Sequence, residues 1–374
     1  MRNALAPLTL LAIFLFAGCG GTAATTATQS GGGTTPTVTG KITVSGTNVL
    51  RDGTPWVMHG AQIIAFVAPP AAQTTYFLAA YQHYSTAELL ALQSWGANAV
   101  RFQVSQPGLD PQNALFNAAF LTQIQGAVTY ARSIGLNVIV CVQDEVQSGE
   151  TSPAMVPNAA TVRVWQELAP LFNADTGIMY EILNEPYLTP STQNWATWQT
   201  AMSTVIAAIR ATGSTNAMIA DGLSYAQILT GAPAPTDALN QVIYAEHPYF
   251  EGTTTELPAT WAANWGTFAA TEPVMITEWS TTTTNYCDAN TPTAALGLLQ
   301  YIAAHNLGLN GNAYDNPGSV TIGNYATLGS IVQDFNGTPT TFLGTGAACG
   351  GVGFGPGKLI QNYYKTGSVA TVLQ

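Results

Sequence analysis

The chain has 374 residues, of which 47% are hydrophobic and only 8% are charged, and its formal net charge is −11. With nine lysines and arginines in total, it offers no basic stripe to neutralise phosphates, so its composition argues against nucleic acid as a partner. The four histidines are scattered and the cysteine spacing resembles no zinc site. We therefore expect no metal, and the sequence implies no cofactor.

The N-terminus has the features of an export signal. A basic start is followed by an apolar run over residues 8–17 and by Gly18-Cys19. This arrangement resembles the bacterial lipobox, which implies removal of residues 1–18 and a lipid anchor on Cys19. The alternative is an ordinary signal peptide with a chance cysteine. Both alternatives predict export, either as a lipoprotein of the bacterial cell envelope or surface or as a secreted protein.

Residues 19–40 predict a flexible tether, because this segment is rich in Gly, Thr and Ser and has no large apolar side chain to bury. The remaining residues, 41–374, show no break in composition. A length of roughly 330 residues suits a single α/β barrel. We expect one domain there, and a monomer whose only contact with a membrane is the lipid anchor.

Short β-rich apolar runs alternate with segments of helical period along this domain, which predicts a parallel sheet built from βαβ units. Strands are expected at residues 56–64, 97–104, 136–143, 178–185, 217–223, 241–249, 273–280 and 307–315. Helices are expected at residues 86–96, 119–135, 161–172, 195–213, 258–268, 292–306 and 358–365. The predicted fold is a (β/α)8 TIM barrel, preceded by a short β-hairpin at residues 42–56 that closes the bottom of the barrel.

The cysteines beyond residue 19 divide into two kinds. Cys141 lies inside a predicted apolar strand and should be a buried free thiol. Cys287 and Cys349 lie in irregular segments of an exported chain and could form a disulfide.

Two glutamates follow predicted strands that lie across the barrel from each other. Glu185 ends the fourth strand and Glu278 ends the seventh, at the edge where barrel enzymes carry their chemistry. Such a pair can lie about 5 Å apart, which is the separation that a retaining glycosidase uses. One carboxyl then donates a proton to the leaving oxygen, while the ionised one attacks the anomeric carbon.

Several strand ends carry motifs in a recognisable order. These are Arg101 in NAVRF, Asn184-Glu185-Pro186, His247-Pro248-Tyr249 and Glu278 in MITEWS. On these residues the chain resembles glycoside hydrolase family 5, the cellulase and mannanase family of the retaining barrel clan. The alternative is that Arg101 and Glu278 form a buried ion pair inside an inert barrel.

The resemblance implies a role for each matching residue. Glu185 is expected to be the acid/base and Glu278 the nucleophile, while Asn184 binds the sugar 2-hydroxyl. Arg101 and Tyr249 are expected to support the nucleophile, and His247 to lie beside the acid/base.

Two strand ends depart from the family pattern. Where the family often has a His after the third strand, this chain has Gln143-Asp144-Glu145, which could bind sugar or be solvated loop groups. Where the family has a Trp floor after the eighth strand, Asn312 takes the place, unless a shift of two brings Tyr314 there.

Sugar sites usually contain aromatic platforms, because the apolar face of a pyranose stacks on a ring. We therefore expect the substrate to contact Gln143, Tyr187, Trp279 and Tyr314. Phe66, Tyr225 and Phe250 are further aromatic candidates near strand ends.

The sequence thus predicts an endo-acting β-glycosidase that hydrolyses a β-glucan such as cellulose, or a β-mannan, by double displacement. Two alternatives remain open at this point. The chain could be a noncatalytic surface glycan-binding lipoprotein, which the missing Trp favours, or a transglycosylase that uses the same two glutamates.

Overall fold

The computed structural model describes residues 39–249, 258–280, 291–317, 330–340 and 356–369. All of these described residues belong to one compact unit. The predicted signal peptide, nearly all of the tether, and Cys19, Phe250, Cys287 and Cys349 lie outside the described residues. Among the helices that are described, none is both long and apolar enough to cross a membrane.

Eight strands close into a barrel in the order β10-β11-β4-β5-β6-β7-β8-β9, and every neighbouring pair is parallel. Their bounds are β4 His59–Ile63, β5 Ala99–Ser105, β6 Asn137–Gln143, β7 Ile178–Glu181, β8 Met218–Asp221, β9 Val242–Glu246, β10 Val274–Trp279 and β11 Gly308–Gly311. Each falls within a predicted strand, apart from the last residue of β5. The (β/α)8 prediction is therefore confirmed.

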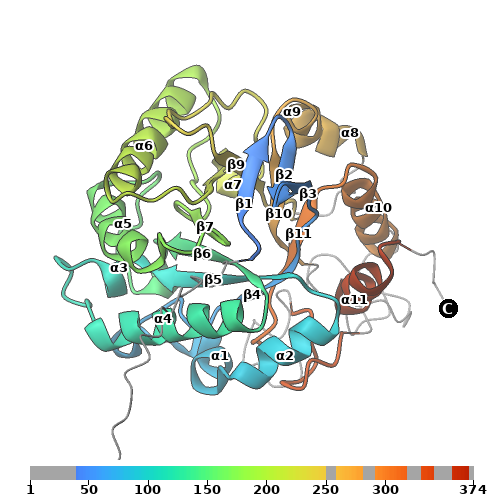
Figure 1. The fold of residues 1–374 in the computed structure, drawn as a ribbon, viewed down its shortest axis with the longest axis horizontal. Coiled ribbons are helices and arrows are strands. Elements are labelled where there is room, and N and C mark those ends of the chain that lie inside the picture. Colours follow the sequence, from blue (N-terminus) through green and yellow to red (C-terminus); the bar gives the residue numbers. More distant parts are fainter. Residues whose placement is uncertain (1–38, 250–257, 281–290, 318–329, 341–355, 370–374) are drawn as a thin grey trace, which may run out of the picture. The chain divides into compact units, whose positions relative to one another are not determined.

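Helices surround this ring of strands (Figure 1). The longer ones are α2 Thr86–Ser94, α4 Ala118–Ser133, α5 Ala159–Phe172, α6 Thr192–Ala211, α10 Thr291–Ala304 and α11 Pro356–Thr366. The short ones are α1 Leu78–His83, α3 Gln106–Leu109, α7 Leu223–Ala226, α8 Pro258–Trp261 and α9 Thr267–Ala269, with a π-helical turn at Ala262–Gly266. Three of the longer helices begin at side-chain caps that accept backbone N–H groups, at Asn117, Asn158 and Ser191.

The N-terminal segment closes the bottom of the barrel, as predicted. It forms a three-stranded antiparallel sheet of β1 Ile42–Ser45, β2 Asn48–Arg51 and β3 Thr54–Pro55. The buried side chains of Ile42 and Val49 pack in one apolar cluster with residues from the lower ends of the barrel strands, including Ala99, Met179 and Met275.

The barrel interior changes from apolar to polar along the strands. Side chains alternate between the two sides of a strand, so each residue two positions beyond an inward-facing one also faces inward. Ala99 is followed in this way by Arg101, and Met179 by Glu181. Cys141, on β6, is a buried free thiol, as predicted. The polar layer lies at the C-terminal ends of the strands, where the predicted site should be.

Candidate active site

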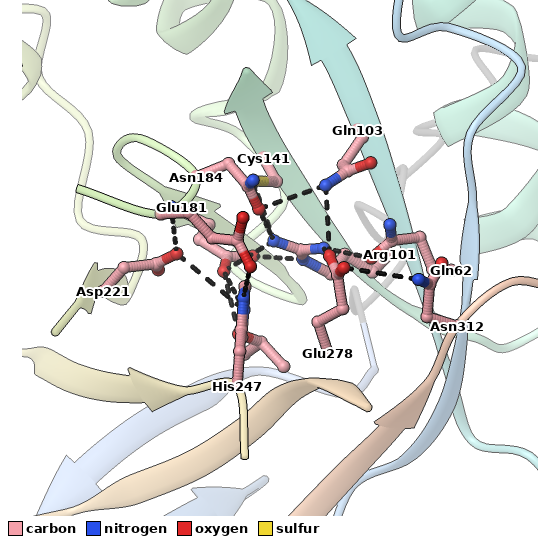
Figure 2. A network of polar contacts seen from close by, with 12 residues as sticks. Gln62, Arg101, Gln103, Cys141, Glu181, Asn184, Asp221, His247, Glu278 and Asn312 are labelled. Atoms are coloured by element: carbon pink, nitrogen blue, oxygen red, sulfur yellow. Dashed lines mark hydrogen bonds and ion pairs between the residues drawn. The ribbon is translucent and has the colours of Figure 1, made fainter. Parts of the chain in front are cut away.

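Arg101, on β5, lies at the centre of the polar layer and is fully buried (Figure 2). Its guanidinium donates to both oxygens of Glu181, at 2.6 and 3.0 Å, and to Oε2 of Glu278 at 2.8 Å. The remaining partners are side chains from three further segments: Gln62, Cys141 and Asn184. Although burial alone would lower it, the pKa of Arg101 is raised by its neighbours, and the side chain stays charged.

Glu278 faces the interior because β10 is irregular near its end. The register against β11 shifts between Ile276 and Trp279, and both Thr277 and Glu278 bond to interior side chains. Four donors surround the Glu278 carboxylate: Arg101 and Gln103 at Oε2, and Tyr249 and Asn312 at Oε1. They occupy the roughly four acceptor positions of a carboxylate, and one of them, the Arg101 guanidinium, carries a positive charge.

Asn312, just after β11, sets the direction of one of these bonds. Its amide nitrogen lies 2.8 Å from the Tyr249 hydroxyl and 3.3 Å from Glu278 Oε1. An amide nitrogen only donates, so the phenol oxygen accepts from Asn312 and the phenol hydrogen points to Glu278, 2.8 Å away. Burial raises the pKa of Tyr249, so the phenol keeps this hydrogen.

Glu185 enters the site from a strained turn after β7. Its φ of 52° is left-handed, a conformation uncommon for a residue other than glycine. A bond of 2.9 Å from the Glu185 backbone N–H to Asp221 Oδ2 holds this turn in place. Backbone strain of this kind clusters at functional sites. The Glu185 side chain is 17% exposed, against 10% for Glu278, so it is the more accessible of the two carboxyls.

His247 lies beside Glu185, as the sequence predicted. Its Nδ1 is 2.9 Å from Glu185 Oε1, and its Nε2 is 2.9 Å from the Thr277 hydroxyl. Burial lowers the pKa of His247 to about 4, so the imidazole is neutral at neutral pH.

The two glutamates meet across the barrel mouth. A carboxylate oxygen of Glu185, a ring nitrogen of His247 and a carboxylate oxygen of Glu278 all lie within 4.8 Å of one another. This spacing is close to that of the carboxyl pair in retaining glycosidases. One carboxylate is paired with a cation and the other with a neutral imidazole, so their environments differ in the sense that an acid and a nucleophile need.

Two groups of side chains have a spacing that could hold a metal ion. One is Glu185, His247 and Glu278, and the other is Glu181, Asp221 and His247. In both groups the two ring nitrogens of His247 already face protein partners at 2.9 Å. The contacts of the described residues are therefore those of a hydrogen-bonded network, and an ion would have to displace them.

Glu145, which the sequence left open between sugar contact and solvated loop, is attached to this network. The Asn184 side chain donates to Glu145 Oε1 at 2.9 Å, and its own oxygen accepts from Arg101 and Gln103. Burial raises the pKa of Glu145 to about 8. The chain thus places a third carboxyl, largely protonated at neutral pH, next to the glutamate pair.

Gln143 ends β6 and is 4% exposed. Its amide oxygen finds no hydrogen-bond partner among the described residues. An inward position near the barrel mouth fits the prediction that Gln143 contacts substrate.

Two of the predicted substrate-binding rings are buried in the core and do not face the barrel mouth. The sequence-based assignment of these two residues is therefore wrong. Trp279 follows the irregular part of β10 and turns outward into the core between strands and helices, where it is 0% exposed. Tyr314 is 1% exposed and packs edge-on against Trp95, with ring centroids 5.2 Å apart. Phe66, also buried, belongs to the same core.

Tyr187, two residues after Glu185, stacks on a second ring. Its hydroxyl donates to the Pro153 carbonyl at 2.7 Å, and its ring stacks on Tyr225 with centroids 5.7 Å apart. Tyr225 is 52% exposed and has a left-handed φ of 60°. Its backbone N–H bonds to the carbonyl of Pro186 at 3.0 Å, which ties the pair to the residue after Glu185. Tyr225 therefore presents an exposed ring that stacks on Tyr187, and the pair is joined to the loop that follows Glu185.

Comparison with known families decides the assignment. A sequence profile described as Cellulase (glycosyl hydrolase family 5) matches residues 67–316, which is more than half of the chain and includes both glutamates. The chain belongs to glycosyl hydrolase family 5. It is therefore a glycosyl hydrolase, as the order of its strand-end motifs predicted.

Relatives of this family 5 chain include a manganese-dependent endoglucanase, Eg5A, from Phanerodontia chrysosporium, which is 24% identical over 200 residues. That match covers 50% of this chain and 47% of the relative, so the chain spans about half the length of the curated relative it matches.

Solved structures share the fold of this family 5 chain. The β-glucanase SdGluc5_26A from Saccharophagus degradans, in complex with cellotetraose, aligns with a TM-score of 0.62 and 21% identity, covering 80% of this chain and 89% of its own. The catalytic domain of Thermobifida fusca endoglucanase Cel5A aligns with a TM-score of 0.61 and 18% identity, covering 87% and 98%.

Several members of the network in this family 5 hydrolase were not singled out from sequence. They are Gln62, Gln103, Glu181, Asp221 and Thr277. A usable signal was present, because each is a polar residue within or at the end of an otherwise apolar strand. Each also stands two or four residues after a residue of the apolar cluster inside the barrel, so its side chain is expected to face inward.

Proposed function

We propose that the chain is an endo-acting β-glucanase that hydrolyses internal β-linkages with retention of configuration. In this proposal Glu278 is the nucleophile and Glu185 the acid/base. Glu185 protonates the leaving oxygen as Glu278 attacks the anomeric carbon, and then takes a proton from the water that releases the glycosyl-enzyme.

The approach of the two carboxylates to within 4.8 Å carries this proposal. Their different partners support the division of roles. Glu278 bonds to the charged Arg101 and is suited to attack as an anion, whereas Glu185 bonds to a neutral imidazole and is more exposed. The supporting roles proposed for Arg101, Tyr249 and His247 follow from the same contacts.

The relatives' names favour a glucan over a mannan, since they are an endoglucanase and a β-glucanase bound to cellotetraose. The stacked rings of Tyr187 and Tyr225 offer an apolar face to a pyranose. Because the backbone of Tyr225 bonds to the residue after Glu185, we propose that the leaving sugar stacks on Tyr225. Asn184 and Gln143 are the proposed hydrogen-bonding contacts to sugar hydroxyls.

A reducing-end assay on soluble β-glucan, cellulose, mannan and xylan tests the substrate. We expect release of short oligosaccharides from β-glucan, and a Glu278→Gln variant that keeps the melting temperature but loses turnover. Hydrolysis of mannan alone would replace the glucan assignment, and undiminished hydrolysis by Glu278→Gln would remove the nucleophile assignment.

A noncatalytic glycan-binding role was favoured only by the missing Trp after the eighth strand. The residue in its place, Asn312, donates to both Tyr249 and Glu278, and a pure binding protein has no need of such an arrangement. Transfer to a sugar instead of water uses the same glutamates. Product sizing separates the two reactions, because transfer makes oligosaccharides longer than the starting one.

We also propose that the protein is exported and lipid-anchored through Cys19, as a monomer at the bacterial cell envelope. The basic start, the apolar run and Gly18-Cys19 support this. Mass spectrometry of the mature N-terminus should find lipid on Cys19, and a Cys19→Ser variant should lose it. An unmodified N-terminus at another residue would point to ordinary secretion.

A further inference from the structure

We infer that Thr277 is a positioning residue that keeps the proton on Glu185, acting through His247. This inference rests on the proposed function and assigns a task to a threonine that neither attacks nor protonates the sugar. It follows from the direction of three consecutive hydrogen bonds, which run from Glu181 through Thr277 and His247 to Glu185.

The first bond fixes the hydrogen of the Thr277 hydroxyl. Its oxygen lies 2.9 Å from Glu181 Oε1, and Glu181 also accepts two bonds from Arg101. Burial alone would raise the pKa of Glu181, but Arg101 outweighs burial and lowers it, so this carboxylate is ionised. An ionised carboxylate only accepts, and the Thr277 hydrogen must therefore point to Glu181.

The second bond fixes the tautomer of His247. Because the Thr277 hydrogen is committed to Glu181, the hydroxyl oxygen can only accept from His247 Nε2, 2.9 Å away. The buried, neutral imidazole carries one ring hydrogen, and that hydrogen is then on Nε2. Its Nδ1 is left as an acceptor.

The third bond places the proton on Glu185. Nδ1 of His247 and Oε1 of Glu185 are 2.9 Å apart, and two acceptors at that distance bond only if one of them carries a hydrogen. The hydrogen is therefore on Glu185, which is the form that an acid catalyst needs before cleavage. Once this proton has moved to the leaving oxygen, the carboxylate faces a lone pair, which favours its recovery of a proton from water.

Other ionisable groups also surround His247 and Glu185. They are Arg101, Glu145, Glu181, Asp221, Tyr249 and Glu278. All of them remain when Thr277 is replaced, so a comparison of variants at this position isolates the effect of the hydroxyl.

A Thr277→Val substitution keeps the shape of the side chain and removes the hydroxyl. His247 can then carry its hydrogen on Nδ1 and donate it to an ionised Glu185, so the acid form is lost at lower pH. We expect the alkaline limb of kcat/KM on phenyl β-cellobioside to move down by about one pH unit, which lowers activity there about tenfold. Dinitrophenyl β-cellobioside should be cleaved nearly as before, because its leaving group needs no proton.

Thr277→Ser keeps the hydroxyl and should restore the wild-type pH profile. Thr129→Val, on the exposed face of α4, is the matched control and should leave kcat/KM unchanged for both substrates. Equal losses on both substrates, or an unshifted alkaline limb, would overturn the inference. A wild-type enzyme that cleaves neither glycoside nor any β-glucan would instead overturn the proposed function.

Discussion

The Arg101→Met substitution tests how the polar layer is held together. Arg101 is 0% exposed and pairs with Glu181 and Glu278, whose side chains are 0% and 10% exposed. Methionine has a similar length but no charge, so both carboxylates would be left without their cation. Removing one partner of a buried ion pair costs about 3–5 kcal/mol, and we expect a loss of this size in the free energy of unfolding at neutral pH.

The loss should depend on pH with a definite sign. In the wild type the pKa of Glu181 is lowered, so its contribution to stability is present above the unfolded pKa and disappears as pH falls through the folded value. Without Arg101, burial raises that pKa, and the variant loses stability as pH rises. The difference between the two proteins should therefore be larger at pH 8 than at pH 4.

Urea unfolding at both pH values measures this difference. Glu181→Gln added to Arg101→Met should recover part of the lost free energy of unfolding, because it removes one buried carboxylate that has no cation beside it. Arg163→Met is the matched control, since Arg163 pairs with Asp110 but is 28% exposed, and we expect about 1 kcal/mol there. If Arg101→Met were as stable as the wild type, or equally destabilised at both pH values, the buried network would not have the energetics argued above.

Three further substitutions have defined outcomes. The pKa of Glu145 rises from 4.5 to about 8 on folding, so wild-type stability should fall as pH rises through that interval. Calorimetric scans at pH 5 and pH 8 should show a smaller loss of stability between the two pH values for Glu145→Gln than for the wild type. An equal loss in both proteins would contradict this. Asn312→Asp converts a hydrogen-bond donor into an acceptor that takes the Tyr249 hydrogen away from Glu278. We expect kcat to fall about tenfold to a hundredfold with little change in KM. A rise in KM alone would show that Asn312 binds substrate instead. Tyr225→Ala should raise KM for cello-oligosaccharides by about fivefold, which corresponds to a stacking contribution of about 1 kcal/mol. A fall in kcat alone would contradict the proposal that the sugar stacks on Tyr225.

Much of the barrel follows from the sequence, because a buried parallel strand needs a continuous apolar run and its helix needs an apolar stripe. The glutamates could be found for a related reason. A charged residue at the C-terminal end of such a run lies at the open end of the barrel, as Glu185 and Glu278 do.

The direction of individual side chains was harder to predict. A regular β10 would place Thr277 and Glu278 on opposite sides, but the shift in register turns both inward and sends Trp279 into the core. No pattern of residue types signals that shift. Tyr314 was misassigned for a similar reason, because the chain leaves β11 and turns the ring toward Trp95.

The contacts of Asn312 and Glu145 could not be read from sequence either. Each bond depends on two segments far apart in the chain, such as the pair Asn312 and Tyr249 or the pair Glu145 and Asn184. The resemblance to family 5 showed only that the expected His after the third strand and the expected Trp after the eighth strand were missing. The structure shows which partners the replacements have.

The stereochemistry of the first product tests the central claim most directly, namely that Glu185 and Glu278 act on one sugar as acid and nucleophile. Proton NMR can follow the anomeric signals during hydrolysis of a cello-oligosaccharide, before mutarotation mixes the anomers. Carboxylates within 4.8 Å of each other leave no room for water between nucleophile and sugar, so the β-anomer should accumulate first. Initial release of the α-anomer would mean inversion, and would contradict the double displacement.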